Sequence, residues 1–250
     1  MLIIENLRKQ FKNGYVGLES INLTVNRHEI VTFIGTSGCG KSTLLRTIAG
    51  LEHVTQGEVR IDHLKIEEPH PEIGIIFQEP RLMPWLNVLD NVQFGLHHLP
   101  RNQRRQLASE ALAKVGLSNF AKCLPHQLSG GMAQRVAIAR ALVTNPSILL
   151  LDEPFSALDS FTRLKLQNRL LEIWEYDRPT LILVTHDVEE ALILSDRIIV
   201  MRGNPGRIHQ EITLNLPRSR KRSDPEFQYW KEKLLNALDL SDVHLVPAEV

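Results

Sequence analysis

The chain has 250 residues, and 29 lysine and arginine residues balance 29 aspartate and glutamate residues, so its formal net charge is zero. This balance excludes a domain that holds nucleic acid by bulk positive charge. A composition that is 43% apolar and 23% charged excludes an acidic disordered protein. A length of 250 residues fits one large domain or two small ones, and either can bury a sizeable core.

The first part of the chain predicts short strands, and the middle part predicts helices. Runs rich in valine, isoleucine and threonine predict strands over 2–4, 21–25, 29–34, 57–61 and 73–77, with a helix over 44–51. From 80 to 145 the apolar spacing is helical, with helices over 107–115 and 136–143. Strands over 147–151, 180–184 and 197–201 then alternate with helices over 162–174 and 188–194.

This order of elements predicts an α/β core interrupted by a helical insertion near 80–145. The two all-apolar strands over 147–151 and 180–184 indicate a parallel sheet covered on both faces. No stretch approaches 18 uncharged apolar residues, so we expect no membrane span. Residues 1–5 lack the basic leader of a secretory signal, and two cysteines do not make a disulfide framework, which favours a reducing cytosol.

Residues 35–42 fit the phosphate-loop pattern G-x-x-x-x-G-K-[ST] between a predicted strand and a predicted helix. Small residues let backbone N–H groups converge on a polyphosphate, and the helix N-terminus adds partial positive charge. Lys41 is expected to reach the β- and γ-phosphates, and the Ser42 hydroxyl to bind Mg²⁺. A glycine-rich turn with an exposed lysine is the plainer alternative. A dinucleotide fingerprint is excluded because Thr43 stands where its third glycine is needed.

Two adjacent acids, Asp152 and Glu153, follow the buried strand over 147–151. The carboxyl edge of a parallel sheet is where a nucleotide-bound Mg²⁺ is expected. Asp152 is therefore the candidate metal ligand, and Glu153 the candidate base that polarises a water aimed at the γ-phosphate. A strand followed by Asp-Glu is common in α/β proteins, so this pair gains its meaning from the phosphate loop.

Several further segments make the chain resemble the ATP-binding cassette ATPases, and their order along the chain fits that family. The matching segments are Leu128-Ser129-Gly130-Gly131-Met132 for the signature, Gln78 for the Q-loop, Ser156-Ala157-Leu158-Asp159 for the D-loop, His186 for the switch histidine and Phe11 for the aromatic that stacks on adenine. The match covers roughly residues 2–210. Tyr15 competes with Phe11 for the adenine contact. Met132 replaces the glutamine more common in the signature, and Thr36 stands where proline is frequent.

The resemblance implies a P-loop NTPase fold, namely a mostly parallel core sheet with an N-terminal antiparallel β subdomain and an inserted helical subdomain. Its domains would be an ATPase domain over 1–210, with the helical subdomain at about 80–145, and a helical C-terminal extension over 211–250. ATP and Mg²⁺ would be bound, with Glu153, His186 and Gln78 catalytic and Ser42, Gln78 and Asp152 at the metal. The nucleotide contacts would be Phe11, Gly35, Thr36, Ser37, Gly38, Cys39, Gly40, Lys41, Ser42, Thr43, Ser129, Gly130 and Gly131.

The same resemblance implies the partners and the location. Two copies would pair head to tail around ATP on the cytoplasmic face of the inner membrane, bound peripherally to transmembrane permease subunits and indirectly to a solute-binding protein, without nucleic acid. Segments 77–85, 90–92, 128–142 and 203–208 resemble the importers of nitrate, sulfonate and taurine. The sequence does not name the solute. A soluble cassette ATPase of DNA repair or translation is the alternative, although such proteins usually carry coiled-coil insertions or two cassettes. A P-loop kinase or GTPase has no place for the Ser-Gly-Gly signature.

Four features allow two interpretations each. Trp85, with Leu82 and Met83, is either a partner anchor in the permease-facing segment 79–99 or an ordinary core residue. The basic run Arg218, Arg220, Lys221 and Arg222 is either a solvated linker or a contact for anionic lipid. Trp230, Leu234, Leu235 and Leu238 predict an amphipathic helix that packs on the core or on a partner. Cys39 is either a small spectator or a thiol activated by the helix N-terminus.

Overall fold

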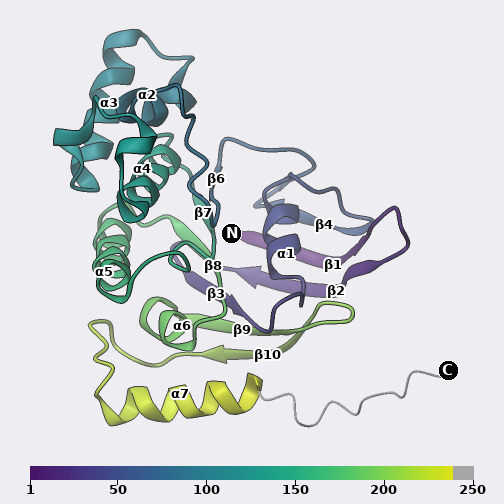
Figure 1. The fold of residues 1–250 in the computed structure, drawn as a ribbon. Coiled ribbons are helices and arrows are strands. Elements are labelled where there is room, and N and C mark those ends of the chain that lie inside the picture. The colour runs from purple at the N-terminus through teal and green to yellow at the C-terminus, as the bar shows by residue number, and fades with distance from the viewer. Residues whose placement is uncertain (239–250) are drawn as a thin grey trace.

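Two sheets organise residues 1–238, the part of the chain that the computed structural model describes (Figure 1). The larger sheet has the strand order β10-β9-β3-β8-β7-β6. Its strands are β3 (Ile30–Ile34), β6 (Ile73–Ile76), β7 (Ile148–Asp152), β8 (Thr180–Thr185), β9 (Arg197–Arg202) and β10 (Arg207–Thr213). Neighbouring strands pair in parallel from β9 to β6, and β10 pairs with β9 antiparallel.

The smaller sheet is antiparallel and has the order β2-β1-β4-β5. Its strands are β1 (Leu2–Gln10), β2 (Val16–Val25), β4 (Gln56–Ile61) and β5 (Leu64–Lys65). The predicted α/β fold, with a mostly parallel core sheet and an N-terminal antiparallel sheet, is therefore confirmed.

The central strands are apolar throughout because the large sheet separates two hydrophobic cores. Successive side chains of a strand point to opposite faces. In β7, Ile148 and Leu150 pack with the small sheet and the first helix, whereas Leu149 and Leu151 pack with the remaining helices. Phe33 and Ile34 of β3 divide in the same way. Burial of every residue of β3, β7 and β8 removes the alternation that a half-exposed strand would show.

Residues 1–238 contain seven helices. They are α1 (Lys41–Ile48), α2 (Val88–Gln93), α3 (Arg101–Lys114), α4 (Gly130–Leu142), α5 (Ser160–Asp177), α6 (Val188–Leu194) and α7 (Pro225–Leu238), with short 3₁₀ turns at Phe94–Leu96, Ser118–Phe120 and Pro125–Gln127. Helices α2, α3 and α4 contact one another and gather at one end of the molecule, away from the small sheet (Figure 1). No helix in the described part of the chain combines the length and apolarity needed to cross a bilayer.

Residues 214–224, the C-terminal arm between β10 and α7, pack on the core, so the solvated-linker interpretation of the basic run is wrong for its three arginines. Arg218 donates to the Leu194 carbonyl and pairs with Asp196, and Arg222 pairs with Glu189. Arg220 donates to three backbone carbonyls, those of Leu192, Ser195 and Leu216. Burial lowers the pKa of Arg220 to about 10. These arginines fasten the arm to α6 and to the two residues that follow it, Ser195 and Asp196.

Helix α7 follows the arm and packs on α6 through the apolar face of this amphipathic helix (Figure 1). Phe227 and Leu234 are buried in the core, and Trp230 and Leu238 pack against it. Leu235, by contrast, is exposed. Of the predicted extension over 211–250, residues 239–250 lie outside the described residues. The extension also contains part of β10, a strand that the sequence patterns left unassigned.

Candidate active site

The carboxyl ends of four parallel strands bring the predicted site residues to one edge of the large sheet. Strand β3 leads into the loop 35–42, and β6 leads into Gln78. Strand β7 ends at Asp152, and β8 leads into His186. Because these strands lie side by side in parallel, segments distant in sequence converge here.

The loop 35–42 has the backbone geometry of an anion cradle. Gly38 and Gly40 adopt positive φ angles of 79° and 98°, which glycine tolerates without strain. A Cβ on Gly40 would lie 2.8 Å from a methyl of Leu18 and 3.0 Å from the Gly17 carbonyl oxygen. Gly40 precedes α1 and offers no side-chain cap, which leaves the first N–H groups of the helix for an incoming anion.

Lys41 is held over this loop by backbone carbonyls. Its side chain is buried, with 5% exposure, and Nζ donates to the Gly35 oxygen at 2.7 Å and to the Thr36 oxygen at 2.9 Å. Nζ also lies 3.6 Å from Cys39 Sγ. The Cys39 side chain is buried beneath the loop, which favours the spectator interpretation over a solvent-accessible thiol.

A cavity of about 370 Å³ opens beside the loop. Its lining combines the phosphate-loop residues Ser37, Gly38, Gly40, Lys41, Ser42 and Thr43 with Phe11, Tyr15, Gly17 and Glu153. The predicted contacts Gly35, Thr36 and Cys39 belong to the same loop but are not part of this lining. One cavity therefore joins a phosphate cradle, two aromatic rings and a carboxylate.

Phe11 and Tyr15 both line the cavity, so both remain candidates for the adenine contact. Their rings stack with centroids 6.1 Å apart and planes 21° apart. Phe11 is half-buried with Lys9 Nζ 5.3 Å from its ring centroid, whereas Tyr15 is exposed. A Cβ on Gly17 would lie 2.7 Å from the Phe11 ring, so the glycine makes room for this ring.

Ser42 and Asp152 form a pair of hard oxygen donors at the sheet edge. The Ser42 hydroxyl donates to Asp152 Oδ1 at 2.8 Å. Burial raises the pKa of Asp152, and the Ser42 hydrogen bond and the charges of Arg46 and Lys41 oppose the rise. A hydroxyl and a carboxylate suit Mg²⁺, so the donor set fits the expected ion. Gln78, the third predicted ligand, instead donates from Nε2 to Ser156 Oγ at 3.2 Å.

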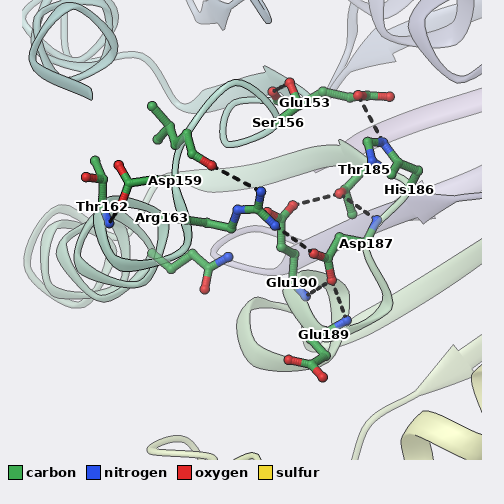
Figure 2. A network of polar contacts seen from close by, with 12 residues as sticks. Glu153, Ser156, Asp159, Thr162, Arg163, Thr185, His186, Asp187, Glu189 and Glu190 are labelled. Atoms are coloured by element: carbon green, nitrogen blue, oxygen red, sulfur yellow. Dashed lines mark hydrogen bonds and ion pairs between the residues drawn. The ribbon is translucent and has the colours of Figure 1, made fainter. Parts of the chain in front are cut away.

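Glu153 and His186 meet across the edge of the sheet (Figure 2). His186 Nδ1 lies 3.1 Å from Glu153 Oε2. Glu153 adopts a φ of 45°, an unusual angle for a residue with a side chain, and its N–H donates to the Val184 carbonyl at 2.9 Å. Strained backbone held in place by its surroundings is frequent at functional sites. The structure thus brings together the two side chains predicted to be catalytic.

The signature segment lies away from this cavity. Ser129 caps α4, since its hydroxyl accepts from Met132 N at 3.3 Å. Gly130 is exposed and a Cβ there would meet no atom within 4 Å, whereas a Cβ on Gly131 would lie 2.5 Å from Thr162 Cγ2. None of these three residues lines the cavity beside Lys41. Within one chain, the signature segment and the phosphate loop therefore do not share this cavity.

The loop before α2 presents Trp85 to solvent with 75% exposure, so its interpretation as a core residue is wrong. Asn91 holds this loop because its buried amide accepts from Met83 N at 2.8 Å and donates to the carbonyls of Met83 and Leu86. Leu82, in contrast, packs partly against the core.

Sequence reasoning missed a buried polar cluster beside His186. Glu190 is 3% exposed and accepts from the Thr185 hydroxyl at 2.7 Å (Figure 2). Burial raises its pKa. Arg163 of α5 reaches into the same cluster. The only sequence signal was a glutamate in the first turn of a helix that follows a buried strand, a pattern that does not reveal its burial.

Comparison with known proteins decides the family. The family model described as ABC transporter matches residues 18–156, which is more than half of the chain. The chain belongs to the ABC transporter family. Among the relatives of this ABC protein is an aliphatic sulfonates import ATP-binding protein of Pseudomonas syringae pv. tomato, 50% identical over 94% of this chain and 97% of the relative. An ABC transporter ATP-binding protein of Methanocaldococcus jannaschii is 48% identical over 95% of this chain and 91% of the relative.

Solved structures agree with this assignment. A dimeric ATP-binding cassette in a post-hydrolysis state, bound to ADP and phosphate, has a TM-score of 0.77 and 37% identity, and the match covers 87% of this chain and all of that one. The structure of cbiO1 from Clostridium perfringens, part of the ABC transporter complex cbiONQ, has a TM-score of 0.76 and 30% identity, and the match covers 85% of this chain and 88% of that one. This ABC protein is an ATPase subunit of an importer.

Proposed function

We propose that this ATPase drives import of an aliphatic sulfonate or a closely related small organic anion. The support comes from relatives about half identical to the chain over nearly its full length, in Pseudomonas and Bacillus, whose names specify aliphatic sulfonate import. Nitrate and taurine are the competing solutes. The cavity beside Lys41 binds nucleotide rather than the solute, so solute choice belongs to other subunits.

In this proposal ATP occupies the cavity with its phosphates on the loop 35–42 and its base against Phe11 or Tyr15. Lys41 exchanges its contacts to the Gly35 and Thr36 carbonyls for the β- and γ-phosphates. Ser42 and Asp152 would hold Mg²⁺, which neutralises part of the phosphate charge when bound. Gln78 is proposed to sense the γ-phosphate and to complete the metal site by moving from Ser156.

Glu153 is the proposed general base for the attacking water. Its carboxylate lines the nucleotide cavity, and its backbone is anchored to β8 through the Val184 carbonyl. His186, 3.1 Å away, orients this carboxylate and reaches towards the γ-phosphate. Glu153 directly follows β7 and His186 directly follows β8, so their contact depends on the register between these two strands.

A second copy of the chain completes each nucleotide site in this proposal. Ser129, Gly130 and Gly131 open α4 and suit phosphate, yet they do not line the cavity of their own chain. A head-to-tail pair places them over the nucleotide of the partner. This interpretation accords with a related cassette that is dimeric with ADP and phosphate bound.

The docking surface for the permease is proposed on segment 79–99. Trp85 and Phe94 are both exposed there, and an aromatic anchor in a partner's pocket is typical of interface hot spots. The pair of subunits would then lie peripherally on the cytoplasmic face of the inner membrane. A solute-binding protein would act through the permease rather than by touching this chain.

The deciding experiment tests the solute. Disruption of the gene should abolish growth on an alkanesulfonate as the sole sulfur source and leave growth on sulfate intact, and a plasmid copy should restore growth. The Lys41→Ala copy serves as the inactive control. Normal growth on alkanesulfonates, with loss of growth on nitrate or taurine instead, would reject the sulfonate and retain the importer.

A further inference from the structure

Arg163 connects two loops of the active site through a single side chain (Figure 2). It lies in α5, four residues after Asp159, whose side chain caps that helix. Its guanidinium Nη2 donates to the Leu158 carbonyl at 3.2 Å, and Nη1 donates to Asp187 Oδ2 at 3.1 Å. Leu158 belongs to the segment that follows Glu153, whereas Asp187 directly follows His186.

Thr185 and Asp187, the residues on either side of His186, are both held by hydrogen bonds in the cluster that contains Arg163. Asp187 caps α6, with its Oδ1 accepting from Glu189 N at 2.8 Å and Glu190 N at 3.1 Å, while its Oδ2 faces Arg163. Thr185 donates to Glu190 at 2.7 Å and accepts from Asp187 N at 3.0 Å. The backbone on either side of His186 is thereby tied to one hydrogen-bonded cluster.

The positive charge of Arg163 balances the two carboxylates of this cluster. Asp187 and Glu190 place two carboxylates close together, and Glu190 is almost completely buried. The Arg163 guanidinium is the cation between them, with Nε 3.8 Å from Glu190 Oε1. The other titratable group beside the cluster is His186 itself, and beyond Glu189 lie the cations Arg222 of the C-terminal arm and Lys231 of α7. Removal of Arg163 leaves two facing carboxylates without their shared cation.

The other end of the connection reaches Glu153. Ser156 Oγ donates to the Glu153 carbonyl at 3.0 Å, and the Leu158 N–H donates to the Phe155 carbonyl at 3.2 Å. These bonds make residues 153–158 a hydrogen-bonded turn that ends at the carbonyl held by Arg163. A planar guanidinium suits this position because its donors diverge in fixed directions, which a lysine ammonium does not reproduce.

We propose that Arg163 is a positioning residue that holds His186 against Glu153 by bridging the turn 153–158 to Asp187. The inference rests on the proposed catalytic roles of Glu153 and His186. Its consequence is a selective loss of turnover: Arg163 does not line the nucleotide cavity, so ATP affinity has no direct dependence on it.

The test compares Arg163→Gln with Arg163→Lys and the control Arg169→Gln in the full-length protein. Arg169 lies on the same helix and pairs only with Glu172 among the contacts described. Arg163→Gln should lower kcat about 10–100-fold, the cost typical of slightly misplaced catalytic groups, with ATP Kd changed less than about threefold. Arg163→Lys should restore part of the loss, and Arg169→Gln should keep kcat within about twofold. Unchanged kcat in Arg163→Gln, or an equal fall in Arg169→Gln, would overturn the proposal.

Two further measurements separate positioning from a general effect on folding. Asp187→Asn keeps a good helix cap but removes the charge that Arg163 contacts, so it should reproduce the kcat loss even where Arg163→Gln folds poorly. In a double-mutant cycle with His186→Ala, Arg163→Gln should cause less than about a twofold further loss. Full additivity, or normal kcat in Asp187→Asn, rejects the bridge. Normal turnover in Glu153→Gln would instead reject the proposed base itself.

Discussion

Replacing Glu153 by glutamine tests the proposed base with little change of shape. Glutamine keeps the length of the side chain and one carbonyl oxygen, but it cannot accept a proton from water. Glu153 is partly exposed, and its hydrogen-bonded neighbour His186 is exposed, so the substitution leaves the buried core untouched. We therefore expect unchanged folding with a selective loss of hydrolysis.

The expected loss of hydrolysis rate follows from the proposed role of Glu153 as a general base. A positioned general base contributes about 10²–10⁴-fold to a rate. At about 1.36 kcal/mol for each tenfold change, this loss corresponds to about 2.7–5.4 kcal/mol of transition-state stabilisation. Glutamine still fills the side of the cavity that Glu153 lines, so ATP affinity should stay within about threefold, and hydrolysis-deficient protein should accumulate as an ATP-bound dimer.

Single-turnover hydrolysis and gel filtration with Mg²⁺ and ATP measure both effects. Glu172→Gln is the matched control, because Glu172 is an exposed glutamate of α5 whose partner Arg169 lies on the same helix. The control should hydrolyse ATP at the normal rate. Turnover of Glu153→Gln within about threefold of the unmodified protein would refute the assignment, whatever its oligomeric state.

Three other changes test separate parts of the structure. Phe227→Ala should lower the free energy of unfolding, measured by urea denaturation, by about 3–5 kcal/mol because Phe227 is 1% exposed. Tyr229→Ala, on the exposed face of α7, should change this free energy by less than about 0.5 kcal/mol. Equal effects of the two substitutions would contradict the docking of α7. Phe11→Ala and Tyr15→Ala should each be compared with the unmodified protein by calorimetric ATP titration. Loss of the ring that stacks on adenine should weaken ATP binding by about 0.5–1.5 kcal/mol. Unchanged ATP affinity in both variants would show that neither ring contacts adenine. Because burial raises the pKa of Asp152, its carboxylate takes up a proton at a higher pH than an exposed aspartate does, so Mg²⁺-dependent ATP binding should weaken early as the solution is acidified. A higher Mg²⁺ concentration should move the pH midpoint of this loss of binding to lower pH. A pH midpoint that does not depend on Mg²⁺ would argue against Asp152 as a ligand.

Local patterns in the sequence determined the phosphate loop and most strands. The loop 35–42 is readable because its glycines, Lys41 and the flanking strand and helix are contiguous, and backbone geometry depends on neighbours in the chain. The predicted strands over 180–184 and 197–201 agree closely with β8 and β9 for the same reason. The linear order of motifs was also sufficient to indicate the family.

Tertiary structure alone decided which side chains share an environment. Glu190 reads as a surface glutamate of a helix, yet packing of α5 and α6 buries it beside Arg163. Arg220 reads as part of a solvated basic run, yet three backbone carbonyls surround it. Arg163 and Glu190 are 27 positions apart, and Arg220 lies 28 and 25 positions from Leu192 and Ser195. Such contacts depend on how the helices pack on the sheet, which the whole core determines rather than any local spacing. The separation of Ser129 from the cavity beside Lys41 likewise emerges only when both segments are placed on one fold.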